Sequence, residues 1–141
     1  MTGPLALHVP SGVEHVFVYG TLRRGGANDI TRLQPPPVFI GMARLRGRMY
    51  GFGGYPGVVL DDTADWVEGE VYRFAPDLEP VLDGIEELYP EQRDEYLKRV
   101  VDVEVGRQRL RCLVYELNPR YAEGREPLSP GDWLLHASHC A

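Results

Sequence analysis

A glycine-rich loop directly after an apolar strand is the first stretch whose residue types could do chemistry. The stretch HVFVYGTLRRGGAND covers residues 15–29, and the strand must end at Tyr19, Gly20, Thr21 and Leu22. Backbone N–H groups of such a loop can hold an anion, for example a carboxylate. The loop lacks the Lys-Ser or Lys-Thr pair of a nucleotide-binding P-loop. Glycines are equally common in plain turns, so both interpretations stay open.

An acidic residue near the end of a predicted helix is the second chemical candidate. Leu78, Val81, Leu82 and Ile85 recur at helical spacing and predict an amphipathic helix. This pattern places Glu86 at the rim of the buried face and Glu87 toward water. A carboxylate at the edge of an apolar cavity can act as a general acid or base near neutral pH. The pattern alone favours an ordinary rim residue, because perturbed carboxylates are a minority.

Metal and thiol chemistry have little support in the sequence. The segment HASHC at His136–Cys140 superficially resembles a metal cluster, but no second group of suitable ligands accompanies it. Cys112 lies in an apolar run and is predicted to be a buried thiol, and Cys140 lies near the chain end. We therefore expect no metal and no cofactor. Two cysteines are too few for a disulfide framework and fit a cytoplasmic location.

Alternating residues define the clearest predicted strand, over Phe39–Tyr50. Small or apolar residues at 43, 45, 47 and 49 alternate with three arginines, Arg44, Arg46 and Arg48. A period of two predicts one buried face and one basic face. The arginine stripe could bind an anion, but a charged strand face is more often plain surface.

The remaining elements predict an α+β fold. The order of strands, with one helix after the fourth and Asp77 as its possible N-cap, indicates a small, mixed, mostly antiparallel sheet or β-barrel with few helices. The regular βαβαβ pattern of a Rossmann fold is absent. The predicted strands are Val16–Tyr19, Phe39–Tyr50, Val58–Leu60, Trp66–Phe74, Tyr96–Val105 and Arg109–Leu117, the last two forming a hairpin.

Length and charge exclude several classes of partner. The chain has 141 residues and a formal net charge of −6, with no basic run. This composition argues against nucleic acid and against an anionic membrane surface. The sequence also shows no membrane span and no signal peptide. We expect a single domain over residues 1–141, with its core at about 14–135, and a small-molecule substrate.

Seven short blocks, in order, resemble the gamma-glutamylcyclotransferase-like family. The loop VYGTLRRGGAN is similar to the family's first-strand signature, and LDGIE at Leu82–Glu86 is similar to its L-D-x-x-E block. The Tyr-Gly-Thr-Leu form resembles the gamma-glutamylamine cyclotransferase branch. One departure concerns the Y-x-R strand, which appears here as YLKR, so either Lys98 replaces the arginine or the register shifts by one. The other blocks are GYPGVV, VEGEVY, EYLKR, LVYEL and GDW.

The resemblance implies an enzyme that releases 5-oxoproline and a free amine from a gamma-glutamyl amide, a metal-independent transferase reaction. It implies that the substrate's own alpha-amine attacks the gamma-carbonyl, with Glu86 as general acid and base. The substrate-binding residues that it implies are Tyr19, Gly20, Thr21, Leu22 and, by its place in the partner strand, Tyr115. Two alternatives remain: a non-catalytic binding module on the same fold, and removal of a gamma-glutamyl protecting group in biosynthesis.

Overall fold

The structure is a computed structural model that describes residues 11–88 and 95–139, the side chains of 86–88 and 137–139 excepted. Six strands form one sheet in the order β3-β2-β4-β1-β6-β5. The strands are β1 (His15–Val18), β2 (Val38–Gly51), β3 (Pro56–Leu60), β4 (Trp66–Arg73), β5 (Tyr96–Val105) and β6 (Gln108–Leu117).

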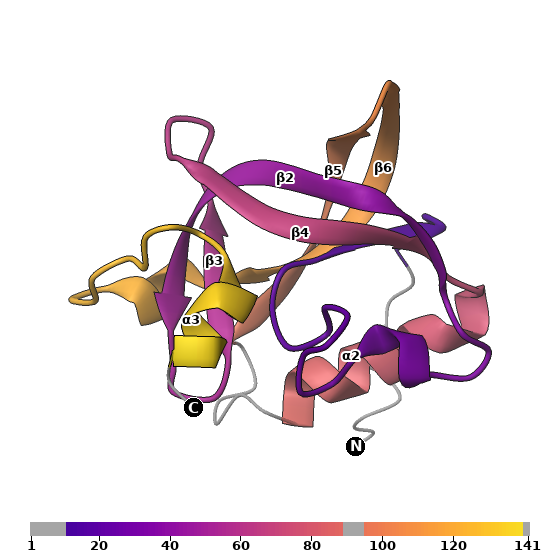
Figure 1. The fold of residues 1–141 in the computed structure, drawn as a ribbon, viewed down its shortest axis with the longest axis horizontal. Helices are drawn as coiled ribbons and strands as arrows, with labels where there is room; N and C mark the ends of the chain where they lie inside the picture. The colour runs from indigo at the N-terminus through magenta and orange to yellow at the C-terminus, as the bar shows by residue number, and fades with distance from the viewer. Residues whose placement is uncertain (1–10, 89–94, 140–141) are drawn as a thin grey trace, which may run out of the picture.

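The sheet curls into a nearly closed barrel (Figure 1). All paired strands are antiparallel except β1 and β6, which run parallel. The two ends of the sheet approach each other, since β5 lies against β2 and β3 lies against β6. The predicted class, a small, mostly antiparallel β-barrel with few helices, is therefore confirmed.

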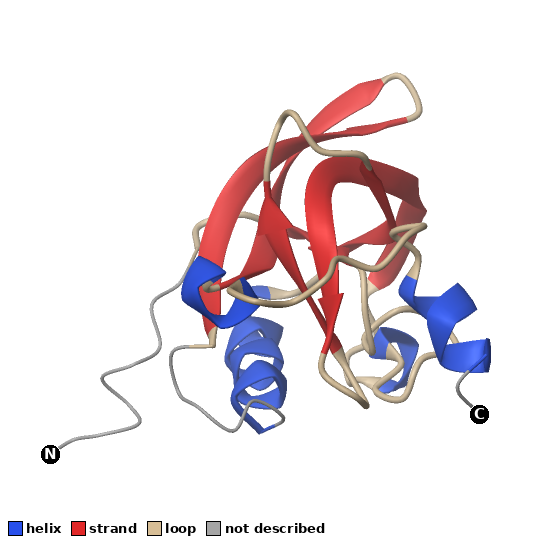
Figure 2. Ribbon diagram, turned by 90° about the vertical axis from the view of Figure 1, so that its left-hand side faces the viewer, coloured by secondary structure: helices blue, strands red, loops and turns tan. Residues whose placement is uncertain are grey.

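The helical segments are short and lie outside the barrel (Figure 2). The longest, α2, follows a 3-10 turn directly. These segments are η1 (Ile30–Arg32), η2 (Pro76–Leu78), α2 (Glu79–Leu88), η3 (Pro119–Ala122) and α3 (Trp133–His139). Asp77 does not cap the helix as predicted: Ala75 is the N-cap of η2, and Asp77 lies inside the turn, because Pro76 already starts it.

Strand β1 contributes to two separate hydrophobic cores, as its unbroken apolar run predicts. Phe17 and Tyr19 belong to the core that contains side chains from all six strands, which is the barrel interior. Val16 and Val18 belong to a second core on the outer face, which Leu78 and Leu82 cover. The barrel interior also needs Gly69, because a Cβ there would lie 2.4 Å from the Phe17 ring.

The buried face of α2 differs from the predicted one. Leu82 is fully buried and Ile85 packs at the edge of the outer core, but Val81 is 44% exposed. On the other side, Glu79 is only 3% exposed, because it binds Lys98 of β5. The helix thus turns Glu79, paired with the half-buried Lys98, toward the protein and leaves Val81 exposed.

The arginines of β2 form a surface face, as the alternation predicts. Arg44 and Arg46 stack on Trp66, at 4.6 Å and 4.1 Å from the ring centroid, and Arg48 pairs with Asp61. The three arginines are thus in contact with other surface residues of the same chain. A wide groove of about 860 Å³ lies between this face and the β5–β6 hairpin, away from the residues of the predicted site.

Candidate functional site

A small cavity lies at the carboxyl end of β1. Its walls are Phe17, Val18, the four loop residues Tyr19–Leu22, and Tyr115 of β6. Its volume is only about 20 Å³, so a ligand larger than water would have to widen it. The structure thus brings together five of the residues assigned to substrate binding: Tyr19, Gly20, Thr21, Leu22 and Tyr115.

Three consecutive backbone donors of this loop have no acceptor among the residues that the structure describes. No residue in the described part of the chain accepts a hydrogen bond from the N–H of Gly20, Thr21 or Leu22. The next donors are satisfied, since Arg23 N–H binds the carbonyl of Gly20 at 3.0 Å and Arg24 N–H binds the Glu70 carboxylate at 2.9 Å. Buried backbone donors are normally paired, so three adjacent exceptions are a feature that a ligand can use.

Gly20 has a structural role that the sequence does not reveal. A Cβ at this position would lie 2.7 Å from Cγ and 2.9 Å from Cδ of Pro56, at the start of β3. The loop therefore passes directly under the proline ring. Glycine is thus required here by the contact with Pro56.

Tyr19 joins two strands at the floor of the cavity. Its hydroxyl donates to the carbonyl of Tyr115 at 2.6 Å and accepts from the N–H of Val58 at 3.2 Å. The side chain is buried in the barrel core. Its aromatic ring thus supports the loop from within, and its hydroxyl ties β6 to β3.

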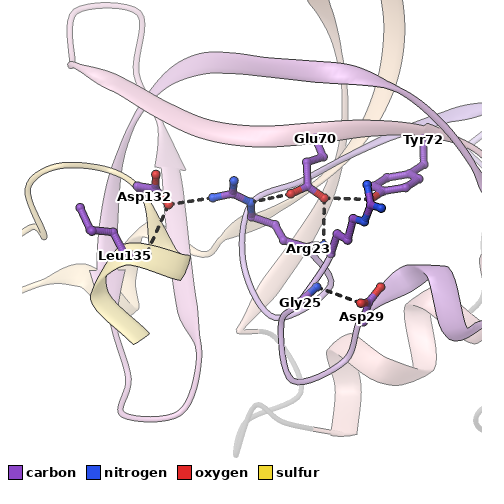
Figure 3. A network of polar contacts seen from close by, with 8 residues as sticks. Arg23, Gly25, Asp29, Glu70, Tyr72, Asp132 and Leu135 are labelled. Atoms are coloured by element: carbon purple, nitrogen blue, oxygen red, sulfur yellow. Dashed lines mark hydrogen bonds and ion pairs between the residues drawn. The ribbon is translucent and has the colours of Figure 1, made fainter. Parts of the chain in front are cut away.

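A buried network holds the far side of the loop (Figure 3). Glu70 of β4 accepts from Arg23 Nε at 3.1 Å, from Arg24 N–H at 2.9 Å and from the Tyr72 hydroxyl at 2.8 Å. Arg23 also binds Asp132 at 2.9 Å. Burial, followed by the hydrogen bond to Glu70 and its negative charge, raises the pKa of Tyr72 well above its ordinary value. Sequence analysis missed this network.

A second polar chain links α2 to the strands beside the cavity. The Tyr115 hydroxyl donates to Asp83 Oδ1 at 2.6 Å. Lys98 Nζ binds Asp83 Oδ2 at 3.0 Å and Glu79 Oε2 at 2.6 Å. Glu79 also accepts from the backbone N–H and the hydroxyl of Ser11. Asp83 and Lys98 were not predicted as site residues, although both lie inside the family-like blocks.

The strand register separates the two cations of the YLKR block. Lys98 pairs with Tyr115 across the β5–β6 ladder, so the two side chains lie on the same face. Arg99 pairs with Val114, and its guanidinium binds Glu116 at 2.9 Å. Lys98 therefore faces the Tyr115 side of the ladder, and Arg99 faces Glu116.

The GYPGVV loop is fastened to the start of β5. The Tyr55 hydroxyl donates to Glu95 at 2.8 Å, and the Tyr96 hydroxyl donates to the carbonyl of Pro56. Glu95 is itself buried. These bonds keep Pro56 in place above Gly20 and so help to define the loop.

The predicted acid/base Glu86 lies in α2, three residues after Asp83, but its side chain is outside the part that the structure describes. Of the segment that superficially resembles a metal cluster, Cys140 and the side chain of His139 also lie outside the described part.

Within the described residues, no group of three His, Cys, Asp or Glu side chains could hold a metal ion. Cys112 is buried as predicted, and this burial, together with the charge of Asp102, raises the pKa of its thiol to about 12.

Solved structures share this fold over most of the chain. A protein from Bacillus subtilis, YkqA, is 28% identical with a TM-score of 0.67; the match covers 92% of this chain and 43% of YkqA. An AIG2-like protein from Mus musculus is 25% identical with a TM-score of 0.61, over 79% of this chain and 83% of that protein. The allophanate hydrolase of Kluyveromyces lactis, at 15% identity, shares the fold alone.

Comparison with curated proteins gave no match. Among the described residues, no helix is long and apolar enough to cross a membrane. The family model for gamma-glutamyl cyclotransferase, AIG2-like, matches residues 16–135, which include the loop after β1, the network around Glu70 and the whole of α2. The chain therefore belongs to the AIG2-like gamma-glutamyl cyclotransferase family.

Proposed function

We propose that the protein cleaves gamma-glutamyl amides of small amines by cyclisation. The alpha-amine of the substrate attacks its own gamma-carbonyl carbon, and a five-membered lactam closes. The former amide C–N bond breaks, so the products are 5-oxoproline and a free amine. The proton lost by the attacking nitrogen is transferred to the departing nitrogen, so the reaction needs no water and no external nucleophile.

The observation on which this proposal rests is the cavity at the end of β1. The N–H groups of Gly20, Thr21 and Leu22 have no acceptor among the described residues and belong to its lining. Such donors suit the carboxylate of a glutamyl group, or the oxygen that becomes negative when the gamma-carbonyl is attacked. Their fixed positions would hold the flexible glutamyl chain folded, which favours ring closure.

Glu86 is the residue that we assign to the proton transfers. It is the acidic residue of the L-D-x-x-E block, and it follows Asp83 by three positions and Leu82 by four on α2. Residues with these spacings share one side of a helix. Asp83 binds Tyr115 of the cavity and Leu82 is buried against the sheet. A carboxylate one turn further along this side would reach the cavity from α2.

The test is a panel of gamma-glutamyl amides and peptides assayed for release of 5-oxoproline. We expect release from at least one small gamma-glutamyl amine. If 5-oxoproline is released only from a biosynthetic intermediate that carries a gamma-glutamyl group, the same reaction would serve to remove a protecting group. Tight binding without release of 5-oxoproline from any compound would contradict the proposal and favour a binding module.

A further inference from the structure

The groove between β2 and the β5–β6 hairpin lies where the sheet does not close, and its volume is about 860 Å³. No ladder joins these two strands in the described residues, although they approach each other at Gly41, where a Cβ would lie 2.7 Å from Cγ1 of Val105. The hairpin forms one side of the groove and projects beyond the barrel (Figures 1 and 2). A groove next to a projecting hairpin is a shape that can fit a second copy of itself.

The two sides of the groove differ in charge. One side, which we call the basic bank, is formed by β2 and the connection from β3 to β4, and the hairpin forms the other, the acidic bank. The charged residues are Arg44, Arg46 and Asp62 on the basic bank and Asp102, Glu104 and Arg109 on the acidic bank. Each bank thus has two charges of one sign and one of the other, so the net charges of the two banks are opposite.

Most of these charges have no ion-pair partner among the described residues. Arg44 and Arg46 form no ion pair, and neither does Asp102. Glu104 and Arg109 approach each other at 3.5 Å, but both side chains are well exposed, and water weakens such a pair. All five side chains are exposed, so they are available to the charges of another molecule.

Exposed apolar side chains lie on β2 close to the point where this strand approaches the hairpin. Val38, Phe39 and Met42 are 49%, 45% and 56% exposed, and they belong to one short stretch of the strand. Met42 directly follows Gly41, at which β2 meets the hairpin. Exposed apolar groups that lie close together typically mark a contact with another protein surface, and their burial would favour association.

We propose that two copies of the chain associate through this groove, with the hairpin of each copy lying in the groove of the other. A twofold axis along the groove places the basic bank of each copy against the acidic bank of the other, and it keeps the Met42 ends of the two grooves together. A twofold axis across the groove would instead place like banks against each other. The charges therefore select the first axis. This proposal does not depend on the proposed function.

Sedimentation equilibrium of the full chain tests the proposal. We expect a dimer with a dissociation constant of roughly 100 μM or tighter. Arg44→Glu/Arg46→Glu should weaken the dimer at least about tenfold, because both banks are then acidic and like charges meet across the contact. Asp102→Lys/Glu104→Lys should weaken it similarly, because both banks are then basic.

An equimolar mixture of these two charge-reversed variants is the sharpest test, because the acidic banks of one variant meet the basic banks of the other. We expect the mixture to form a heterodimer about as tight as the wild-type dimer, although neither variant associates well alone. The control is Arg120→Glu/Arg125→Glu, which makes the same change of charge at exposed positions that do not line the groove. It should dimerise like the wild type.

Met42→Ser tests the direction of the axis, since an axis along the groove brings the Met42 ends together. This substitution should weaken the dimer at least about threefold, because less apolar surface is buried. Val81→Ser is the matched control, because Val81 is also exposed, at 44%, but lies on α2 and does not line the groove. It should leave the dimer unchanged.

Urea unfolding shows whether each variant is folded, and if one charge-reversed variant is not, the other decides together with Met42→Ser. A wild-type protein that stays monomeric overturns the proposal, as does a dimer that the charge reversals leave intact. Failure of the mixture of two folded variants to associate, or an equal effect of Met42→Ser and Val81→Ser, overturns the twofold arrangement.

Discussion

Adjacent residues of similar chemistry can have different surroundings, because a strand or a helix turns neighbouring side chains in different directions. Lys98 and Arg99 are both cations, but strand alternation turns the first toward Asp83 and the second toward Glu116. Glu86 and Glu87 are both glutamates, but consecutive positions on a helix differ by about 100°. Substituting one member of such a pair, with the other member as the control, therefore tests the role of a single side chain.

Glu86→Gln should lower the turnover of a gamma-glutamyl amide by at least roughly a hundredfold, because general acid–base catalysis typically contributes 10²–10⁴-fold. Glutamine keeps the size of the side chain but cannot take up the proton of the amine. Binding of 5-oxoproline and the urea midpoint should change little. Initial rates of 5-oxoproline release measure the effect.

Glu87→Gln is the matched control, with the same substitution at the next position. We expect its turnover to change less than about threefold, because the sequence pattern predicts that Glu87 points toward water, and substitutions at such positions usually have small effects. A large loss in Glu87→Gln with a small loss in Glu86→Gln would show that the helix phase derived from the sequence is wrong. Normal turnover in both variants would remove Glu86 from the mechanism.

At the scale of the elements, the loop after β1 depends on its contact with β3. Gly20→Ala should weaken binding of 5-oxoproline at least about tenfold, because the new Cβ collides with the Pro56 ring and displaces the loop N–H groups. Larger residues such as valine should have a stronger effect. Titration calorimetry measures the affinity, and urea unfolding reports whether the barrel stays folded.

The double variant Gly20→Ala/Pro56→Ala distinguishes the collision from other causes. Removal of Cγ and Cδ of Pro56 leaves room for the added methyl group, so affinity should recover in part relative to Gly20→Ala. Gly54→Ala serves as a control, since a Cβ there meets nothing within 4 Å. If the double variant binds no better than Gly20→Ala, contact with Pro56 is not the reason for the loss.

Asp29 accepts hydrogen bonds within the loop after β1, and its charge should make the stability of the protein depend on pH. Burial alone would raise its pKa, but hydrogen bonds from Thr31 and from Gly25 N–H, with the charge of Arg32, lower the pKa below 3.8. A lowered folded-state pKa stabilises the protein above pH 3.8, and this contribution disappears as the pH falls through the folded-state value. Asp29→Asn should therefore cost about 1 kcal/mol at pH 6 and progressively less as the pH falls through the folded-state pKa.

Urea midpoints of the wild type and Asp29→Asn at several pH values measure this dependence, and Asp62→Asn, at an exposed position, is the control. Equal destabilisation of Asp29→Asn at every pH would mean that the lost contacts do not depend on the charge of Asp29.

Local sequence patterns predicted the strands and the helix well. Where the predicted buried face of the helix was wrong, long-range polar contacts are involved. The alternation in Phe39–Tyr50 and the hairpin of Tyr96–Val105 depend on residues close in sequence, and both are confirmed within a few residues. The exposure of Val81 could not be predicted, because it follows from the bond between Glu79 and Lys98, 19 positions apart. The roles of Glu86 and of the loop residues stay predictions.

At the scale of the whole molecule, the Arg23–Glu70–Asp132 network joins three distant parts of the chain. Arg23 and Glu70 are 5% and 4% exposed, so the pair is buried, whereas the Asp132 side chain is 31% exposed. Gly131, just before it, packs on the backbone of Trp66, and Trp133, just after it, fills the end of the barrel core. The loop after β1 is thus held from both β4 and the segment before α3.

Glu70→Ala should reduce the free energy of unfolding by about 3–5 kcal/mol, because it leaves the Arg24 N–H without its acceptor and leaves the buried Arg23 guanidinium with only the more exposed Asp132 among the carboxylates of the network. Asp132→Ala should cost less, since water can reach that carboxylate. Arg109→Ala breaks an exposed pair with Glu104 and should change stability by less than about 0.5 kcal/mol. Denaturant unfolding measures all three, and a Glu70→Ala variant as stable as Arg109→Ala would show that the network is not a stabilising anchor.

The span of this network also has a consequence for the order in which the loop acquires its contacts during synthesis. Arg23 and Asp132 are 109 positions apart, and β1 also pairs in parallel with β6, so the loop after β1 depends on partners that are synthesised much later than the loop itself. Contacts of such long sequence separation form late, after the local hairpins of β2–β3 and β5–β6. On the ribosome, the cavity would therefore be among the last of the described features to acquire its final shape, and Arg23 would lack its Asp132 partner until then.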